Sequence, residues 1–482
     1  MILKRIHLVT PLLLFLFSAI VAIPQLKTPM YTETDPYIHS LTAKAFKDSG
    51  SLNTLYTGLW LPLYPLLLGG ALHVLDDFTL TPRVVNLLFS SGTVVLVYFY
   101  CRELLDLNSR EAVLAGLIYL FFPYRFLIST FPFTEQVFVF FLLLALILIL
   151  KDSPRYIWGV GSFMVAQGIR YEAWYLTPLI MWYVYKSAQS SRIKRVLILV
   201  LIIVPFLWLA INYYSSNDFL LFLTNMRNSS LENFSHAYLN FNYSILNWWR
   251  ALVELFSIPV LLFSLVGFLV TLTNKKDKSS VGFIISIIIF FALVYQSFAA
   301  ILEWFARRYL LIILPFVVAY LIVGLKKIIV LIHNRFLKKD NCFLILFVIG
   351  VVMITITHTY YLLETANRLR YGSFFPTERI RNFNELVDLC TDQKCGDELE
   401  INYYARKTEP LHQFFTLRFY TGILTYIEEQ SVDFLSAETL PANGLMIIEK
   451  EDSAEYKNFY FDNAETLLNN SSFLVLKVKI PT

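Results

Sequence analysis

Two carboxylates lie close together soon after the first strongly apolar segment of the chain. One residue separates Glu33 from Asp35, and Pro36 follows directly. Carboxylates beside a bilayer are costly unless they face water, a partner or a substrate. A carboxylate in such a place can act as the general base that deprotonates an attacking hydroxyl group. The alternative is a solvated pair in which Asp35 only caps the helix that follows.

Other charged residues open apolar runs further along the chain. Glu135 follows Thr134 at the start of a long uncharged stretch, and this pair also fits an ordinary helix start, where acids are favoured. Arg170 and Glu172 occupy a very short turn between two apolar runs. The charge asymmetry of the loops places Glu135 on the same face of the membrane as Asp35, so these two carboxylates can belong to one site.

Two arginines precede a later apolar run. Arg307 and Arg308 stand directly before Tyr309, at a helix end where the distribution of positive charge disfavours arginine. The planar, forked donors of arginine suit a phosphate group, so this position indicates phosphate recognition. Snorkelling, or an ion pair with Glu303, is the structural alternative.

The composition is that of a membrane protein. The chain has 482 residues, of which 57% are hydrophobic and 16% are charged. Its mean hydropathy is +0.58. No class of soluble globular protein has this composition, so we expect a polytopic α-helical protein in contact with membrane lipids. The net charge of +4 is spread over the loops and forms no basic patch, so nucleic acid is not an expected partner.

The apolar pattern predicts about eleven transmembrane helices. The distribution of Lys and Arg places the N-terminus in the cytoplasm and residues 25–82 in the first outer loop. The predicted spans are, approximately, 6–24, 83–101, 110–124, 134–150, 155–168, 172–186, 196–214, 251–272, 280–300, 309–325 and 342–361.

The first outer loop contains two further elements. Leu59–Leu75 is apolar, but two prolines and a glycine pair interrupt it, so we interpret it as interfacial or re-entrant rather than as a span. The segment Pro36–Asp48 is typical of an amphipathic helix that starts at Asp35. The apolar side chains that we expect on one face of that helix are Ile38, Leu41, Ala45 and Phe46.

The chain divides into two predicted domains. Residues 1–361 form the membrane domain, and residues 362–482 form a more acidic tail outside the membrane. Runs such as Leu445–Ile448 and Phe473–Val478 predict strands, and Thr377–Leu389 predicts a helix. We therefore expect a small C-terminal α/β domain outside the cytoplasm.

These motifs, in this order, resemble the GT-C superfamily of membrane glycosyltransferases. The resemblance is to the branch with protein O-mannosyltransferases and lipid A aminoarabinose transferases. It covers residues 1 to about 325. The stretches that carry it are the acidic motif 33–37, the proline-rich segment 61–66, Thr134-Glu135 with the turn 170–172, and the Arg-Tyr-Leu…Pro segment 308–315.

The resemblance implies roles for particular residues. The donor would be a polyprenyl- or dolichyl-phosphate sugar, with Asp35 as the catalytic base, Glu135 as the second outer-loop acid and Arg308 near the lipid phosphate. The first loop reads Glu-Thr-Asp where O-mannosyltransferases have adjacent Asp-Glu, so the role of Glu33 stays open. The further candidates are Arg170, Arg307 and Tyr309 for the donor phosphate, and Tyr37, His39, Tyr64 and Glu172 for the substrates.

We therefore predict a GT-C-like enzyme of the hexosyl- or mannosyltransferase type that transfers a sugar with inversion. The acceptor is a hydroxyl group on a lipid, a glycan or a protein, and the site faces away from the cytoplasm. A prokaryotic plasma (inner) membrane is favoured over the endoplasmic reticulum. The alternatives are a polysaccharide polymerase or ligase, and a transporter of lipid-linked sugars. The sequence assigns no cofactor, and a divalent metal between the acids is an open alternative.

Overall fold

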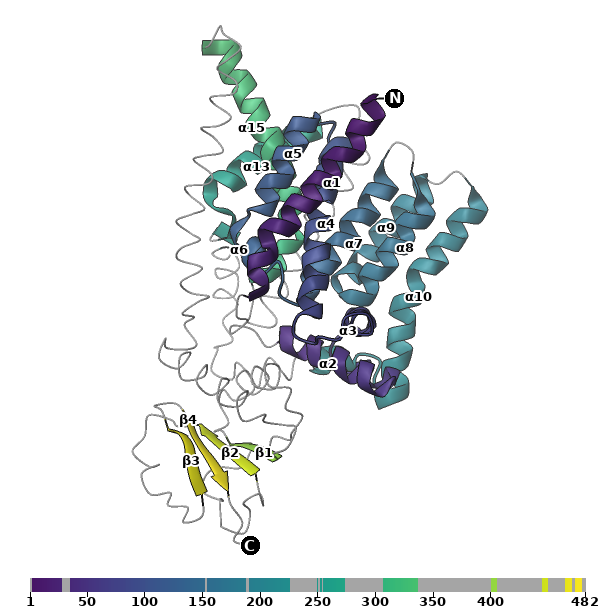
Figure 1. The fold of residues 1–482 in the computed structure, drawn as a ribbon. Helices are drawn as coiled ribbons and strands as arrows, with labels where there is room; N and C mark the ends of the chain where they lie inside the picture. Colours follow the sequence, from purple (N-terminus) through teal and green to yellow (C-terminus); the bar gives the residue numbers. More distant parts are fainter. Residues whose placement is uncertain are drawn as a thin grey trace. The chain divides into compact units, whose positions relative to one another are not determined.

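The computed structural model (Figure 1) describes a large part of the chain. The described residues are 2–27, 35–151, 154–187, 190–225, 249, 252–253, 255–273, 307–336, 400–404, 444–449, 464–469 and 473–478. They group into two compact units, and each unit is described by itself. The first unit consists of Met1–Thr28, Thr42–Asp76 and Leu80–Leu363, and the second of Pro29–Leu41, Asp77–Thr79 and Glu364–Thr482.

The described part of the first unit is helical. Helix α4 contacts α1, α5 and α7, while α8 packs against α7 and α10. Helices α13 and α15 form a further close pair. Figure 1 shows α7, α8, α9 and α10 running side by side. The helices are α1 (Ile2–Ala22), α3 (Leu63–Leu72), α4 (Thr81–Glu103), α5 (Ser109–Leu120), α6 (Pro123–Leu127), α7 (Thr134–Leu150), α8 (Tyr156–Ile169), α9 (Glu172–Ser187), α10 (Ser191–Ser216), α13 (Ile258–Thr273) and α15 (Leu314–Phe336), with 3-10 turns η1 (Ile23–Lys27), η2 (Leu52–Leu55) and η4 (Arg307–Ile312).

Four of the described helical segments are long and apolar enough to cross a bilayer. They are Val9–Leu26, Thr81–Glu103, Ser191–Ser216 and Leu314–Leu331. Shorter apolar helices accompany them, including Thr134–Leu150 and Ile258–Thr273. These helices and the composition show an integral membrane protein. The predicted spans 280–300 and 342–361 lie outside the described residues, so the predicted total of about eleven spans stays a prediction.

Local sequence explains where one of the shorter helices begins and ends. Asn108 caps α5, because its side chain accepts from the Glu111 N–H while the Glu111 carboxylate accepts from the Asn108 N–H. Helix α5 ends at Leu120, before the predicted limit at residue 124. The reason is Pro123, which disfavours helical backbone at the preceding residue. Phe122 is accordingly extended, and Pro123 opens α6.

The predicted span 309–325 also differs from the structure. Residues Arg307–Ile312 form the 3-10 turn η4, and the α-helix begins only at Leu314. Pro315 lies in the first turn of α15, where its fixed φ angle favours a helix start. The consequence is that Arg308 and Tyr309 lie on a tight turn before the helix, rather than on the helix itself.

Helix α3 confirms that Leu59–Leu75 contains no long span. Its 10 residues are too few to cross a bilayer. Figure 1 shows α3 nearly end-on while α4 and α7 run lengthwise, so α3 crosses the direction of its neighbours. A Cβ atom at Gly69 would lie 2.6 Å from Phe46 Cδ1 and 3.1 Å from the Ala43 carbonyl oxygen. A glycine is therefore required for the close approach of this helix to residues 42–49.

Helix α2 (Asp35–Ser49) forms as predicted, but its buried side differs from the expected apolar face. Ala45 is exposed, and Ile38, Leu41 and Phe46 are only half-buried. The buried side chains of α2 are Pro36, Tyr37, His39, Ser40 and Ala43. The protein-facing side of α2 is thus more polar than the sequence pattern indicates, which leaves the apolar residues on the more accessible side.

The second unit contains a small mixed sheet. Its strands are β1 (Glu400–Tyr404), β2 (Gly444–Glu449), β3 (Ala464–Asn469) and β4 (Phe473–Val478), in the order β1-β2-β4-β3. Strands β1 and β2 are parallel, and β4 is antiparallel to both β2 and β3. The predicted strands at Leu445–Ile448 and Phe473–Val478 are confirmed. The predicted helix Thr377–Leu389 lies outside the described residues.

Candidate functional site

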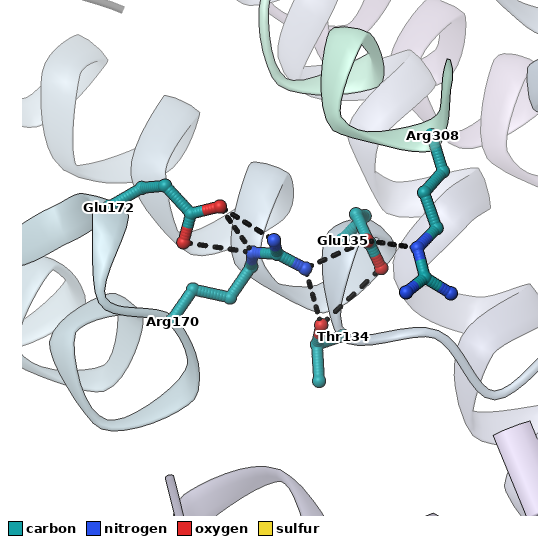
Figure 2. Close-up of polar contacts among 5 residues, drawn as sticks. All are labelled: Thr134, Glu135, Arg170, Glu172 and Arg308. Carbon is teal, nitrogen blue, oxygen red and sulfur yellow. Dashed lines mark hydrogen bonds and ion pairs between the residues drawn. The ribbon is translucent and has the colours of Figure 1, made fainter. Parts of the chain in front are cut away.

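Glu135 lies at the centre of a buried group of charges in the first unit. It occupies the first turn of α7, and the residue is 1% exposed. One of its carboxylate oxygens, Oε1, lies 2.7 Å from Arg170 Nη1 and 3.3 Å from Arg308 Nε. Figure 2 shows the two guanidinium groups approaching this carboxylate from opposite sides. A single carboxylate thus pairs with arginines from two distant parts of the chain.

Arg170 is held by several acceptors at once. It follows the last residue of α8 with an extended backbone, and Glu172 opens α9. Its Nε lies 3.0 and 3.1 Å from the two carboxylate oxygens of Glu172, and its Nη2 lies 2.6 Å from Oε1. Its Nη1 also donates to Thr134 Oγ1 at 2.8 Å. This short turn therefore fixes the plane of the guanidinium group through charge-assisted contacts.

An aromatic ring lies beside both arginines. The guanidinium carbon of Arg170 lies 5.1 Å from the centre of the Tyr309 ring, and that of Arg308 lies 5.4 Å from the same centre. Arg308 also lies 4.9 Å from the centre of the Phe133 ring, and it is 2% exposed. Cations within about 6 Å of an aromatic face are attracted to it. Tyr309 and Phe133 thus stabilise cations that have little contact with water.

Tyr64 on α3 lies within electrostatic reach of this group. The residue is fully buried, and its hydroxyl oxygen accepts a hydrogen bond from Asn86 Nδ2 at 2.5 Å. Burial raises the pKa of Tyr64 well above its usual value, the Asn86 contact partly offsets this, and the charge of Glu135 raises the pKa further. Its phenol group therefore stays protonated and can act as a hydrogen-bond donor.

Tyr171 fixes the turn that carries Arg170. Its hydroxyl donates to the Leu59 carbonyl oxygen at 3.1 Å and accepts from Trp208 Nε1 at 3.0 Å. Its ring stacks on Phe222 at a centroid distance of 4.4 Å. Burial raises the pKa of Tyr171. The turn is thereby anchored to the segment before α3 and to α10.

Several contributing residues were not predicted from the sequence. Thr134 and Phe133 contact the charged group, but hydroxyl and aromatic residues beside an apolar run are too common to be informative. Arg125 was also missed, although an arginine inside the run 121–128 was a visible signal. Arg125 is 1% exposed and donates to the carbonyl oxygens of Leu120 and Ser90. It satisfies the C-terminal end of α5, which is a structural role.

The structure brings together five of the predicted site residues, which are Glu135, Arg170, Glu172, Arg308 and Tyr309. Tyr64 lies nearby in the same unit. Two other predicted residues lie partly or wholly outside the described part of the structure. Nothing is described of Glu33, and Arg307 is described by its place at the start of η4 without its side chain.

The remaining predicted residues belong to the second unit. Asp35 is the first residue of α2, and Tyr37 and His39 are buried residues in its first turns. Since the two units are described separately, a meeting of Asp35 with Glu135 stays a prediction. Among the described residues, no group of three or more His, Cys, Asp or Glu side chains is placed to hold a metal ion.

The described charges of the site are balanced. Two guanidinium groups and two carboxylates, those of Arg170, Arg308, Glu135 and Glu172, form one connected group of ion pairs. Buried charges persist in proteins when they are paired and hydrogen-bonded in this way. Arginines held in fixed planes in a water-poor site are suited to binding a phosphate group and to stabilising charge that develops on it.

The fold is that of a known class of membrane protein. No model of a protein family matches the sequence, and no curated protein matches it by sequence. Among solved structures, the chain is similar to ArnT from Cupriavidus metallidurans bound to undecaprenyl phosphate. The TM-score is 0.64 at 12% identity, over 96% of this chain and 97% of that chain.

The apo form of the same ArnT matches with a TM-score of 0.61 at 11% identity, over 96% of this chain and 97% of that chain. The oligosaccharyltransferase of Archaeoglobus fulgidus matches with a TM-score of 0.47 at 12% identity, over 84% of this chain and 61% of that chain. The likeness to ArnT extends along nearly the whole length of both chains. It shows that this chain has an ArnT-like membrane fold.

Proposed function

We propose that this protein is a glycosyltransferase that transfers a sugar from a polyprenyl- or dolichyl-phosphate donor to an acceptor hydroxyl group. The observation that carries the proposal is the buried pair of arginines, Arg170 and Arg308, on either side of Glu135. The ArnT structure with this fold contains undecaprenyl phosphate, which is a lipid phosphate of the required class. The arginines favour a ligand with a phosphate group, and the ArnT complex favours one with a long prenyl chain.

The proposed reaction is a single displacement. Asp35 takes the proton from the acceptor hydroxyl, and the oxygen attacks the anomeric carbon from the face opposite the phosphate. A new C–O bond forms while the bond from the anomeric carbon to the phosphate oxygen breaks, which inverts the configuration. The electron pair of the broken bond leaves with the lipid phosphate, and the proton stays on Asp35 until water removes it.

The arginines would act on the leaving group. Negative charge accumulates on the bridging phosphate oxygen as the bond breaks, and fixed cations in a water-poor site stabilise it without reorganisation. Removal of one such donor typically slows a reaction by about 100- to 1000-fold. We assign this role to Arg308, assisted by Arg170. Arg307 and Tyr309 are further candidates for contact with the same phosphate.

The substrate side of the proposal rests on the first outer loop. Tyr37 and His39 follow Asp35 on α2, and Tyr64 lies near Glu135, so we propose these three as contacts of the sugar or the acceptor. The positive charge of the opposite loops supports a site that faces away from the cytoplasm. A hexose or mannose is the proposed sugar, and a lipid, glycan or protein hydroxyl is the proposed acceptor.

The experiment compares the purified protein with two variants on a labelled prenyl-phosphate sugar. Asp35→Asn should reduce transfer by about 1000-fold, because a general base contributes about 100- to 10,000-fold. Asp48→Asn is the matched control, since Asp48 is an exposed aspartate at the other end of the same helix. Equal turnover by the Asp35 variant would remove Asp35 from the mechanism. Binding and movement of the labelled lipid without transfer, by the wild-type protein, would indicate a transporter.

A further inference from the structure

We propose that Glu135 is a positioning residue for the donor phosphate site and does not itself accept the proton. It holds the guanidinium groups of Arg308 and Arg170 in fixed planes beside the Tyr309 ring. The inference rests on the proposed function, and it assigns to this acid a task different from the one that its place in the sequence suggests. The inference follows from the contacts of the Glu135 carboxylate and from its contact with Nε of Arg308.

Both oxygens of the Glu135 carboxylate have partners in the site. Oε1 lies 2.7 Å from Arg170 Nη1 and 3.3 Å from Arg308 Nε. The other oxygen, Oε2, lies 3.3 Å from the Thr134 hydroxyl oxygen. A general base needs a lone pair directed at the acceptor hydroxyl, within about 2.6–3.2 Å. A carboxylate already shared by two cations and a hydroxyl is poorly placed for that task.

The contact with Arg308 is made through the nitrogen nearest the aliphatic stem. Figure 2 marks the ion pair with Glu135 at Nε of Arg308 and marks none at its two terminal nitrogens. Contact through Nε fixes the plane and the direction of the guanidinium fork. Arginine recognises phosphate through parallel N–H groups of that fork, so its direction determines which ligand geometry fits.

Arg170 needs a different kind of support. Glu172 binds it through Nε and Nη2, so Glu172 balances most of its charge. Its Nη1 extends to Thr134 Oγ1 at 2.8 Å and to Glu135 Oε1 at 2.7 Å. Thr134 thereby links Arg170 to the second oxygen of Glu135. The carboxylate is held from both ends and can in turn hold Arg308.

The charged and titratable groups around Glu135 come from several elements. They are Arg170 at the end of α8, Glu172 on α9, Arg308 and Tyr309 on η4, and Tyr64 on α3. A pH profile of the enzyme can therefore test the assignment. If Glu135 is not the base, the acidic limb of the profile survives the loss of the Glu135 charge.

The test is a double-mutant cycle of Glu135→Gln and Arg308→Gln, with the KM for a labelled prenyl-phosphate sugar as the readout. Each single variant should raise this KM by about 10-fold or more. The double variant should raise the KM by less than the product of the two single effects, because part of the effect of Glu135 acts through Arg308. The acidic limb of kcat against pH should stay in place in Glu135→Gln.

Thr134→Val is a second variant, because the loss of the Glu135 charge can impair folding by removing a carboxylate that pairs with two buried arginines. It keeps all four charges and removes the hydroxyl that links Arg170 Nη1 to Oε2, so it should raise the donor KM by about 3-fold without moving the pH profile. Additive effects in the cycle, or loss of the acidic limb in Glu135→Gln, would overturn the inference while the proposed function stands. A wild-type protein that neither binds undecaprenyl phosphate nor transfers the sugar would overturn both.

Discussion

Arg170 and Glu135 form a buried ion pair, with 2.7 Å between Nη1 and Oε1. The pair joins the end of α8 to the first turn of α7. Arg170 simultaneously binds Glu172, so one guanidinium group connects two carboxylates. Because the guanidinium fork meets both acceptors at once, the geometry depends on arginine in particular and not on positive charge alone.

This relationship predicts the effect of Arg170→Lys. A lysine keeps the charge but has a single ammonium group, which cannot reach Glu172 and Glu135 together in the same geometry. We expect the free energy of unfolding to fall by about 2 kcal/mol, since loss of one partner of a buried pair costs about 3–5 kcal/mol and the charge is retained here. Thermal unfolding in detergent measures the change. Lys186→Arg is the control, because Lys186 lies at the far end of α9. An unchanged melting temperature in Arg170→Lys would contradict the assigned geometry.

Tyr171→Phe tests the support of the same turn. The variant keeps the ring that stacks on Phe222 and removes the hydrogen bonds to Leu59 and Trp208. We expect a loss of about 1–3 kcal/mol, because buried partners are left unsatisfied. Transfer activity should also fall, because a displaced turn would displace the Arg170 side chain as well.

The effect of Tyr171→Phe should be independent of pH in the ordinary range. Burial raises the pKa of Tyr171, so its phenol stays protonated and keeps its donor role below its usual pKa of about 10. The difference in melting temperature between wild type and variant should therefore be constant from about pH 6 to 9. A difference that changes steeply within this range would mean that another group controls the turn.

Gly267→Ala tests the packing of α13 against α15. A Cβ atom at Gly267 would lie 1.9 Å from the Tyr320 carbonyl oxygen, and one at Gly324 would lie 1.9 Å from the Phe263 carbonyl oxygen. Small residues permit such close approach of helices in membranes. We expect Gly267→Ala to lower the free energy of unfolding by about 1–3 kcal/mol, because α13 and α15 must move apart to make room for the added methyl group.

Gly161→Ala on α8 is the matched control for this packing. A Cβ atom at Gly161 would meet no atom within 4 Å. Alanine is favoured over glycine in a helix by about 1 kcal/mol, so this variant should be neutral or slightly stabilising. Melting temperatures of the two variants, measured in the same detergent, separate the packing effect from helix propensity. Equal effects of the two substitutions would contradict the close contact.

Several features of the fold could be predicted because they depend on local sequence. Apolar runs of sufficient length predicted α4 and α10, and short apolar runs predicted β2 and β4. The prolines and glycines of Leu59–Leu75 indicated a short element rather than a span. These properties depend on solvation and backbone preference, which neighbouring residues largely fix.

Other features depend on residues that are distant along the chain. The side of α2 that packs against protein was not predicted, because periodicity identifies the apolar side but not the side that meets protein when lipid is also available. The observed limits of α5 and α15 differ from the predicted ones. A proline decides where α5 ends, and a 3-10 turn followed by a proline decides where α15 begins. Both kinds of error concern boundaries and partners rather than the existence of helices.

The charged residues of the candidate site show the same division. Sequence alone indicated that Glu135, Arg170 and Arg308 lie at helix ends and on one side of the membrane, because apolar spans force charges to their termini. Folding decided that one oxygen of Glu135 lies against both arginines and that Tyr309 lies beside each. Such contacts depend on the packing of α7, α8 and η4 to within about an ångström, and no pattern along a single segment encodes them.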